Sequence, residues 1–254
     1  MNGRTEFNGT SIIDVTDPHH PKYLAHIPGE EGQDEAGGAQ MVRICDGKQL
    51  PKGDKDTVYM LRVFGNQAHE MWNVTDPAKP RLITKIVENL KGTHKNFWEC
   101  DTGIAYLVSG LPGWRTRRMT SIYDLSDPAK PVHIRDYGLV GQEPGAKKPL
   151  PDNQYQVHGA ISTGVKGNRI YVGYGTVSNG VMQILDRDKL LNGPKEPTEQ
   201  NLLAAQVSIM YTSPHMGAHT TLPILGVDVM DQAANKVSKR DLIALTNEST
   251  SNEC

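Results

Sequence analysis

The chain lacks the features that identify several common classes of protein. It has no long basic run, and its 27 Lys and Arg against 29 Asp and Glu give a net charge of −2. This balance argues against a groove for nucleic acid or a patch for anionic membranes. No apolar run approaches the ~20 residues that span a bilayer. A glycine-rich phosphate loop, a Gly-x-Ser-x-Gly elbow and a His-Glu-x-x-His helix are also missing.

Cysteine is scarce, and its pattern is uninformative. The three cysteines, Cys45, Cys100 and Cys254, include no Cys-x-x-Cys pair. One disulfide is possible, but an odd count gives no disulfide framework, so the redox compartment stays open. The first ten residues show no signal peptide. Because the first repeat begins at residue 14 and no closing copy follows residue 246, we expect a fragment of a longer protein whose remaining blades are missing.

One short motif recurs along the chain. It is Asp-Val-Thr-Asp-Pro-x-x-Pro in the first copy, begins with Asn in the second, and has Leu-Ser in place of Val-Thr in the third. Its copies begin at residues 14, 73 and 124, and a decayed copy without prolines begins at 186, so the steps are 59, 51 and 62 residues. A repeat of this size indicates an array of supersecondary units. Proline ends a strand because it cannot donate to the ladder. We expect Asp17, Asp76 and Asp127 to accept backbone N–H groups in turns, which is a structural role.

Four short stretches rich in β-forming residues fill each interval between motif copies. Short strands at even spacing, four to a unit, favour a β-propeller. We therefore predict an all-β fold, one propeller domain of about four to five four-stranded blades in an incomplete ring. The fourth blade is expected to end in a strand over residues 202–210. The expected blades span residues 1–28, 38–88, 93–138, 156–210 and 217–254.

The motif copies, together with the strands at residues 101–108 and 168–173, resemble the LVIVD repeat family of β-propellers. The resemblance covers roughly residues 11–190. It implies a bacterial propeller of several blades, often exported to the periplasm or secreted, and mostly of unknown activity. It supplies no catalytic residue. The chain departs from the family through insertions at residues 141–153 and 192–200, and through the missing prolines of the fourth copy.

Three histidines recur in register with the blades. His94, His158 and His219 each begin the first strand of a blade, at steps of 64 and 61 residues, and Gln40 holds the matching place in the second blade. The first strands of a propeller line its central channel, so these side chains should converge on one axis. Three imidazoles with an open fourth position are a catalytic pattern for Zn, Cu or Fe. A structural role in hydrogen bonding between blades and a metal-free polar ligand pocket are the alternatives.

Several other residues are weaker candidates. His69 could reach a channel rim, and Glu99 either orients His94 as a partner behind the metal or lies on the surface. Glu248 is a candidate carboxylate ligand or base, and His215 a candidate at the channel mouth. The basic loop at residues 114–118 could bind an anion or be a solvated turn. Solvated positions are expected for His19, His20 and His133.

Two functions from different classes follow from these residues. In the first, the protein is a metalloenzyme in which the three histidines hold the metal and the open position takes water or a small-molecule substrate, for oxidation or metal-assisted hydrolysis. In the second, it is an exported, non-catalytic scaffold whose loops bind a protein or glycan partner. Neither function involves nucleic acid or a transmembrane segment.

Overall fold

The computed structural model describes residues 9–29, 40–148, 155–175, 179–214, 216–233 and 235–248. Strands dominate it, and the only helices in these ranges are three short ones. None of the described helices has the length and apolar character needed to cross a membrane. The all-β class expected from the sequence is therefore confirmed.

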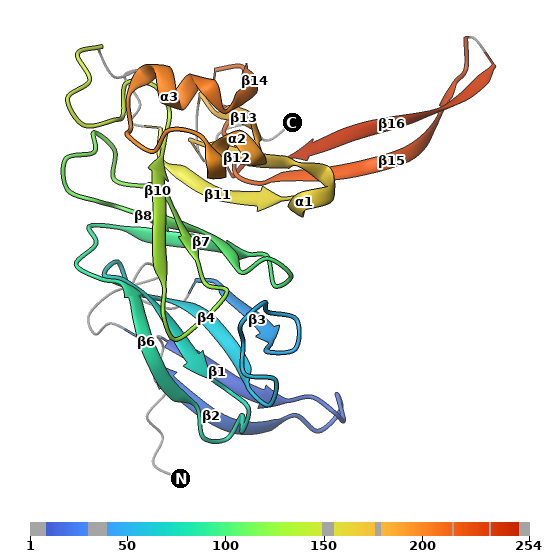
Figure 1. Ribbon diagram of the computed structural model, residues 1–254. Coiled ribbons are helices and arrows are strands. Elements are labelled where there is room, and N and C mark those ends of the chain that lie inside the picture. The colour runs from blue at the N-terminus through green and yellow to red at the C-terminus, as the bar shows by residue number, and fades with distance from the viewer. Residues whose placement is uncertain are drawn as a thin grey trace.

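Three complete four-stranded antiparallel sheets follow one another along the chain, each with its strands in sequence order. Figure 1 shows them as successive units, from the light-blue to teal unit, through the green unit, to the yellow and orange unit. We number the units from the N-terminus and count the two-stranded sheets at the two ends as the first and the fifth. The second unit contains β3 (Val42–Asp46), β4 (Val58–Phe64), β5 (Ala68–Asn73) and β6 (Arg81–Val87). The third contains β7 (Thr93–Trp98), β8 (Ile104–Ser109), β9 (Met119–Asp124) and β10 (Val132–Tyr137). The fourth contains β11 (Val157–Ser162), β12 (Arg169–Tyr174), β13 (Val181–Asp186) and β14 (Gln206–Tyr211).

Each end of the described chain carries a two-stranded sheet instead of a full blade. The first pairs β1 (Gly9–Asp14) with β2 (Lys22–Pro28), and the last pairs β15 (Thr221–Asp231) with β16 (Lys236–Leu245). The β15–β16 hairpin projects from the body (Figure 1). The described residues do not form a closed ring, which matches the incomplete propeller expected from the sequence. The exact blade boundaries stay a prediction.

The repeated motif is a turn device, as its residues predict. In three copies the second aspartate accepts a backbone N–H two residues on, at 3.0 to 3.1 Å, from His19, Ala78 or Ala129. Its own carbonyl accepts a second backbone N–H from the residue three positions later. The proline that follows places β2, β6 and β10 at the outer edge of their sheets, where a missing N–H is tolerated.

The decayed fourth copy forms a helix instead of this turn. Asp186 caps α2 (Arg187–Asn192) by accepting the backbone N–H of Lys189 at 3.0 Å. A second helix, α3 (Glu199–Ala204), follows, with Thr198 as its cap. The strand expected over residues 202–210 is therefore wrong at its start, because residues up to Ala204 are helical and β14 begins at Gln206. A short α1 (Gly164–Gly167) joins β11 to β12.

Buried side chains between neighbouring sheets hold the units together. Leu61, Met71 and Leu107 are fully buried in one cluster, between the second and third units. Tyr106, Ile170 and Tyr174 belong to another, between the third and fourth units. Because apolar area is removed from water on both faces of the third sheet, this packing aligns β7 with β11, the strands that carry His94 and His158.

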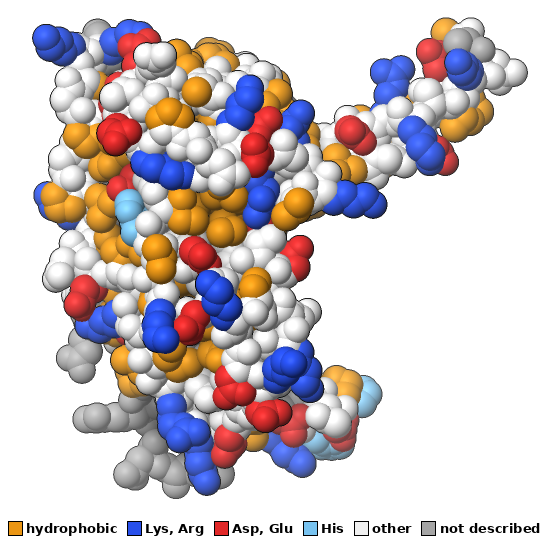
Figure 2. Space-filling view, in the orientation of Figure 1, with side chains coloured by type: hydrophobic (Ala, Val, Ile, Leu, Met, Phe, Trp, Pro, Cys, Tyr) orange, Lys and Arg blue, Asp and Glu red, His pale blue; other side chains and the backbone are white. Residues whose placement is uncertain are grey.

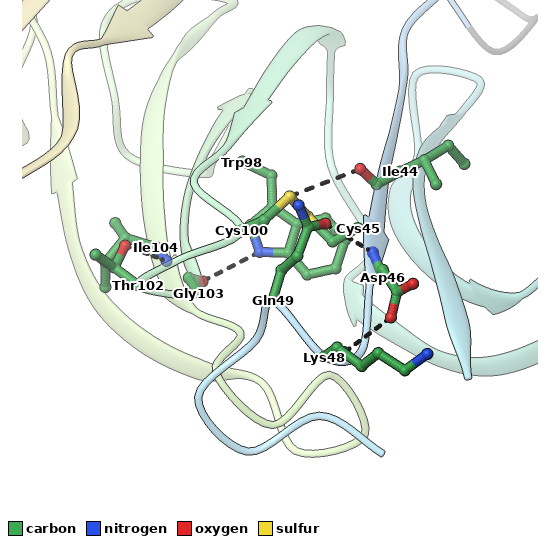
Figure 3. The surroundings of a disulfide bond; sticks show 10 residues. All are labelled: Ile44, Cys45, Asp46, Lys48, Gln49, Trp98, Cys100, Thr102, Gly103 and Ile104. Atoms are coloured by element: carbon green, nitrogen blue, oxygen red, sulfur yellow. Dashed lines mark hydrogen bonds between the residues drawn. A yellow bond between two sulfur atoms is a disulfide. The ribbon is translucent and has the colours of Figure 1, made fainter. Parts of the chain in front are cut away.

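A disulfide and the hydrogen bonds of the buried Arg62 join the second unit to its neighbours. Cys45 on β3 bonds to Cys100, just after β7, with their Cα atoms 5.5 Å apart (Figure 3). The one disulfide that the sequence allowed is therefore present. On the other side, the buried Arg62 donates to Glu70 at 2.8 Å and to the carbonyls of Ile27 and Pro28 on β2. These bonds dock the first sheet on the second.

Candidate functional site

The structure brings the three repeat-matched histidines together. His94 comes from β7, His158 from β11, and His219 from the segment that leads into β15. The ring centroids of His94 and His158 are 4.6 Å apart with the rings edge to face. Those of His158 and His219 are 3.5 Å apart. The three rings lie together, as their spacing in the sequence predicts.

Irregular strand pairing determines the direction of two of these side chains, those of His94 and His158. Between β7 and β8 the register passes from Thr93 to Asn96 against Ser109 and Leu107, so His94 and Lys95 face one residue, Val108. Between β11 and β12 the register likewise shifts at His158. A β-bulge adds a residue, bends its strand and redirects a side chain, and such bulges often lie beside functional sites. Nothing in the sequence marked these two bulges.

Close backbone approach positions the third histidine. A Cβ on Gly173 would lie 2.6 Å from the Ala218 carbonyl oxygen, and one on Gly180 would lie 2.2 Å from the Ala218 nitrogen. The Ala218 N–H in turn donates to the Gly175 carbonyl at 2.7 Å. Only glycine therefore lets the segment before β15 lie against the fourth unit and bring the His219 ring onto His158.

His69, expected at a channel rim, supports the site from behind. It is fully buried, and its Nε2 lies 2.9 Å from the carbonyl oxygen of Val108, the residue opposite the bulge at His94. Burial lowers the pKa of His69 to about 4, against a smaller opposing effect of that hydrogen bond, so the ring is neutral at physiological pH. The rim position expected for His69 is wrong, because β5 is buried between the second and third units at this residue.

Two ring nitrogens in the cluster are buried without a hydrogen-bond partner. They are Nδ1 of His94 and Nε2 of His158, in side chains that are 9% and 3% exposed. A hydrogen bond with the His219 backbone raises the pKa of His158 against the larger effect of burial, so this backbone lies beside the ring. A hydrogen bond on one nitrogen orients the other as a metal ligand. Buried polar atoms are normally paired, so these nitrogens are available to a ligand.

Burial and nearby positive charges favour the neutral form of the imidazoles in the cluster. Burial, followed by the nearby charges of Arg118, His158 and Lys95, lowers the pKa of His94 to about 2. Burial also lowers the pKa of His158 to about 3, with contributions from His219 and Lys95. Neutral imidazole is the form that binds metal.

The cluster needs one rearrangement before it could hold an ion. No group of three or more His, Cys, Asp or Glu side chains in the described ranges is arranged to hold a metal as it stands. Two imidazoles on one tetrahedral ion have centroids roughly 5 Å apart, since N–metal bonds are about 2 Å long. The pair formed by His94 and His158 is near this separation, whereas the His219 ring must rotate away from His158.

The other predicted residues have mixed outcomes. Glu248 lies beside the cluster, with its Oε1 3.7 Å from Nε2 of His219, and its side chain is 53% exposed. Gln40 is half-buried just before β3, so its part in the site stays a prediction. His215 lies outside the described residues. The exposed positions expected for His19, His20 and His133 are confirmed.

Glu99 is neither a partner of His94 nor a surface residue. It is 5% exposed and accepts hydrogen bonds from Arg187 at 2.6 Å and from Tyr106 at 2.9 Å. Ser162 and Thr102 donate to the same carboxylate. The two expectations for this residue are therefore wrong, because Glu99 forms a buried ion pair that joins the third unit to α2 of the fourth.

The basic loop before β9 divides into two roles. The guanidinium of Arg115 donates to the backbone carbonyls of Gly141, Ala146 and Lys148, so it organises the neighbouring loop. Arg118 instead acts on the imidazole cluster through its charge. Reasoning from the sequence did not connect this loop, or Lys95, with the histidines.

Comparisons with known proteins give no functional assignment. No family model matches the chain, and a search of curated proteins found no match. Among solved structures, the chain is similar to Raptor from Chaetomium thermophilum, at 12% identity and a TM-score of 0.44. The match covers 73% of this chain and 14% of the Raptor chain. The chain therefore spans about one seventh of that protein, and a likeness this weak supports no conclusion about function.

Proposed function

We propose that His94, His158 and His219 bind a transition metal, Zn, Cu or Fe, at the axis of an incomplete β-propeller. The observation that carries the proposal is the meeting of three rings from successive units, with two buried nitrogens that lack a partner. Three protein ligands leave a coordination position for water or substrate. When bound, the metal would supply Lewis-acid or redox chemistry, and the protein would be a metal-assisted hydrolase or an oxidoreductase.

The surrounding residues have defined tasks in this proposal. Nε2 of His158 is buried without a hydrogen-bond partner and is therefore free to bind. His69 holds the Val108 carbonyl opposite the bulge and so fixes the direction of His94. Glu248 is close enough to His219 to hydrogen-bond its ring or a water at the open position after a small movement. Its partial exposure makes it the group best placed to exchange protons with solvent.

Metal analysis tests the proposal. We expect near-stoichiometric Zn, Cu or Fe in the wild-type protein by elemental mass spectrometry. The triple variant His94→Ala/His158→Ala/His219→Ala should lose roughly nine-tenths of this metal or more, because it retains none of the three ligands. The matched control His19→Ala/His20→Ala/His133→Ala removes three exposed histidines and should retain the metal.

Circular dichroism must show that both triple variants are folded. Because the ligand substitutions fall in a packed region, the single variant His219→Gln is a milder second test, and it should weaken Zn²⁺ binding at least about tenfold. The proposal fails when the wild type binds no metal after reconstitution, or when the two triple variants bind the same amount.

We also propose an extracytoplasmic location and membership of the LVIVD repeat family. The Cys45–Cys100 disulfide supports the location, since disulfides persist in the periplasm and outside the cell. The turns at Asp17, Asp76 and Asp127, identical in their hydrogen bonds, support the family. Trapping of free thiols in freshly lysed cells tests the location, because a cytoplasmic protein would have both cysteines reduced.

A non-catalytic scaffold for a protein or glycan partner is the second candidate. The β15–β16 hairpin favours it, because Figure 2 shows apolar side chains beside charged ones along the projecting arm. Ile224, Met230 and Val237 are 41%, 53% and 53% exposed there. Apolar residues gathered on a projecting element are typical of interaction sites. A wild-type protein without metal would leave this function as the better one.

A further inference from the structure

A pocket of about 160 Å³ lies beside the imidazole cluster. Its walls come from the second to fifth units: Arg43 from β3, Lys95 from β7, Ala160 from β11 and Thr221 from β15. His158 and His219 form part of the same wall. The pocket therefore shares two side chains with the proposed metal site.

The charge of the pocket has one sign. Arg43 and Lys95 line it, and none of the lining residues is acidic. Arg43 uses only its Nε in a hydrogen bond, to the Asn96 carbonyl at 3.2 Å, and within the described ranges neither cation forms an ion pair. A Cβ added at Gly159 would lie 3.0 Å from Cβ of Lys95, so the lysine stem packs directly on β11 beside His158. Half-buried cations without a counter-ion favour an anionic ligand.

The size and the remaining walls limit that ligand further. Met41, Ala160 and Ile161 give the pocket an apolar side. A cavity of about 150 Å³ accommodates a benzene ring in another protein, so this one suits a ligand of roughly six to ten heavy atoms. A peptide segment or an oligosaccharide is larger than the pocket and could place only a part of itself in it. The Thr221 hydroxyl is buried without a partner, and it can donate to an anionic oxygen.

We infer that this pocket binds a small organic monoanion, a carboxylate with a compact apolar body, next to the metal. The inference deepens the proposed function and rests on it for the metal, since His158 and His219 belong to both sites. The carboxylate pairs with Arg43 and Lys95, and the apolar body lies on Met41, Ala160 and Ile161. The anion also offsets the positive charge that a metal ion adds beside two cations, so metal and anion should favour each other's binding.

Titration with benzoate tests the pocket apart from the metal. Calorimetry on chelator-treated, metal-free protein at low ionic strength should show benzoate binding. Benzamide, which has the same shape without the charge, should bind roughly tenfold more weakly or worse, since a hydrogen bond to a charged group is lost. In protein loaded with Zn²⁺, benzoate should bind more tightly than in the metal-free form.

Two pairs of variants locate the charge. Lys95→Met and Arg43→Met should each weaken benzoate binding roughly tenfold, while Lys166→Met and Arg81→Met, which remove exposed cations elsewhere, should leave it unchanged. The comparison of benzoate with benzamide needs only the wild type, so it decides the matter even where a variant fails to fold.

The outcomes separate this inference from the proposed function. Charge-dependent benzoate binding by a protein that takes up no metal would support the pocket and overturn the metal site. A metal-loaded protein that binds neither probe, or binds both equally well, would overturn the pocket and leave the metal site standing. Equal benzoate affinity in Lys95→Met and Lys166→Met would also overturn it.

Discussion

Replacing Glu99 with alanine is expected to lower the free energy of unfolding by about 3–5 kcal/mol, the usual cost of breaking a buried ion pair. The substitution leaves the guanidinium of Arg187, 8% exposed, without its counter-ion. It also removes the acceptor for the hydroxyls of Tyr106 and Ser162, which lie in two different units. Chemical denaturation followed by tryptophan fluorescence measures the loss.

Two further variants show whether burial is the cause. Glu88→Ala breaks an exposed pair with Lys85, whose members are 52% and 45% exposed, and should cost about 0–1 kcal/mol. The double variant Glu99→Ala/Arg187→Met removes both buried charges and should recover part of the loss. Equal midpoints for the variants at Glu99 and Glu88 would contradict the prediction.

The same carboxylate should make stability depend on pH. Burial alone would raise the pKa of Glu99, but hydrogen bonds from Arg187, Ser162 and Thr102 outweigh it and hold the pKa below its ordinary value. A lowered pKa in the folded state stabilises the protein above the unfolded-state value, about 4.3, and this contribution is lost as the pH falls further. The stability difference between wild type and Glu99→Gln should therefore be constant above about pH 5 and shrink below about pH 4.

Local and periodic features of this fold could be predicted from sequence, whereas contacts across units could not. The turns at Asp17, Asp76 and Asp127 depend on residues two or three positions away, so the motif sufficed. The nearly equal spacing of the histidines placed them at equivalent positions, on β7, on β11 and just before β15. The ion pair of Glu99 with Arg187 joins residues 88 positions apart. No local pattern indicates such a pair.

The errors at the fourth unit and at His69 have physical reasons. Residues 202–204 belong to a helix whose start, Thr198 followed by Glu199, is an ordinary capping signal. The apolar run that continues into β14 obscured this boundary. The place of His69 at the opening of a strand suggests that it could reach a channel rim, but its ring is fully buried and lies within hydrogen-bond distance of the Val108 carbonyl, opposite the bulge. A bulge is visible only once the strands are paired.

Loss of the Cys45–Cys100 disulfide is expected to lower the free energy of unfolding by about 4 kcal/mol, the chain-entropy value for a closed loop of 55 residues. The bond ties β3 to the end of β7, and Cys45 packs in the same buried cluster as Trp98, which lies beside it in Figure 3. The variant Cys45→Ser/Cys100→Ser should therefore unfold at lower denaturant concentration than the oxidised wild type.

The chain offers its own control for this last experiment. A reductant should shift the wild-type midpoint to that of the double variant and leave the variant unchanged, because Cys45 and Cys100 are the cysteines that the described structure pairs. A wild type insensitive to reductant, with the double variant at the same midpoint, would contradict the prediction. Since β7 also carries His94, the reduced protein should hold Zn²⁺ less tightly. The oxidised form would then be the one in which the proposed metal site is complete.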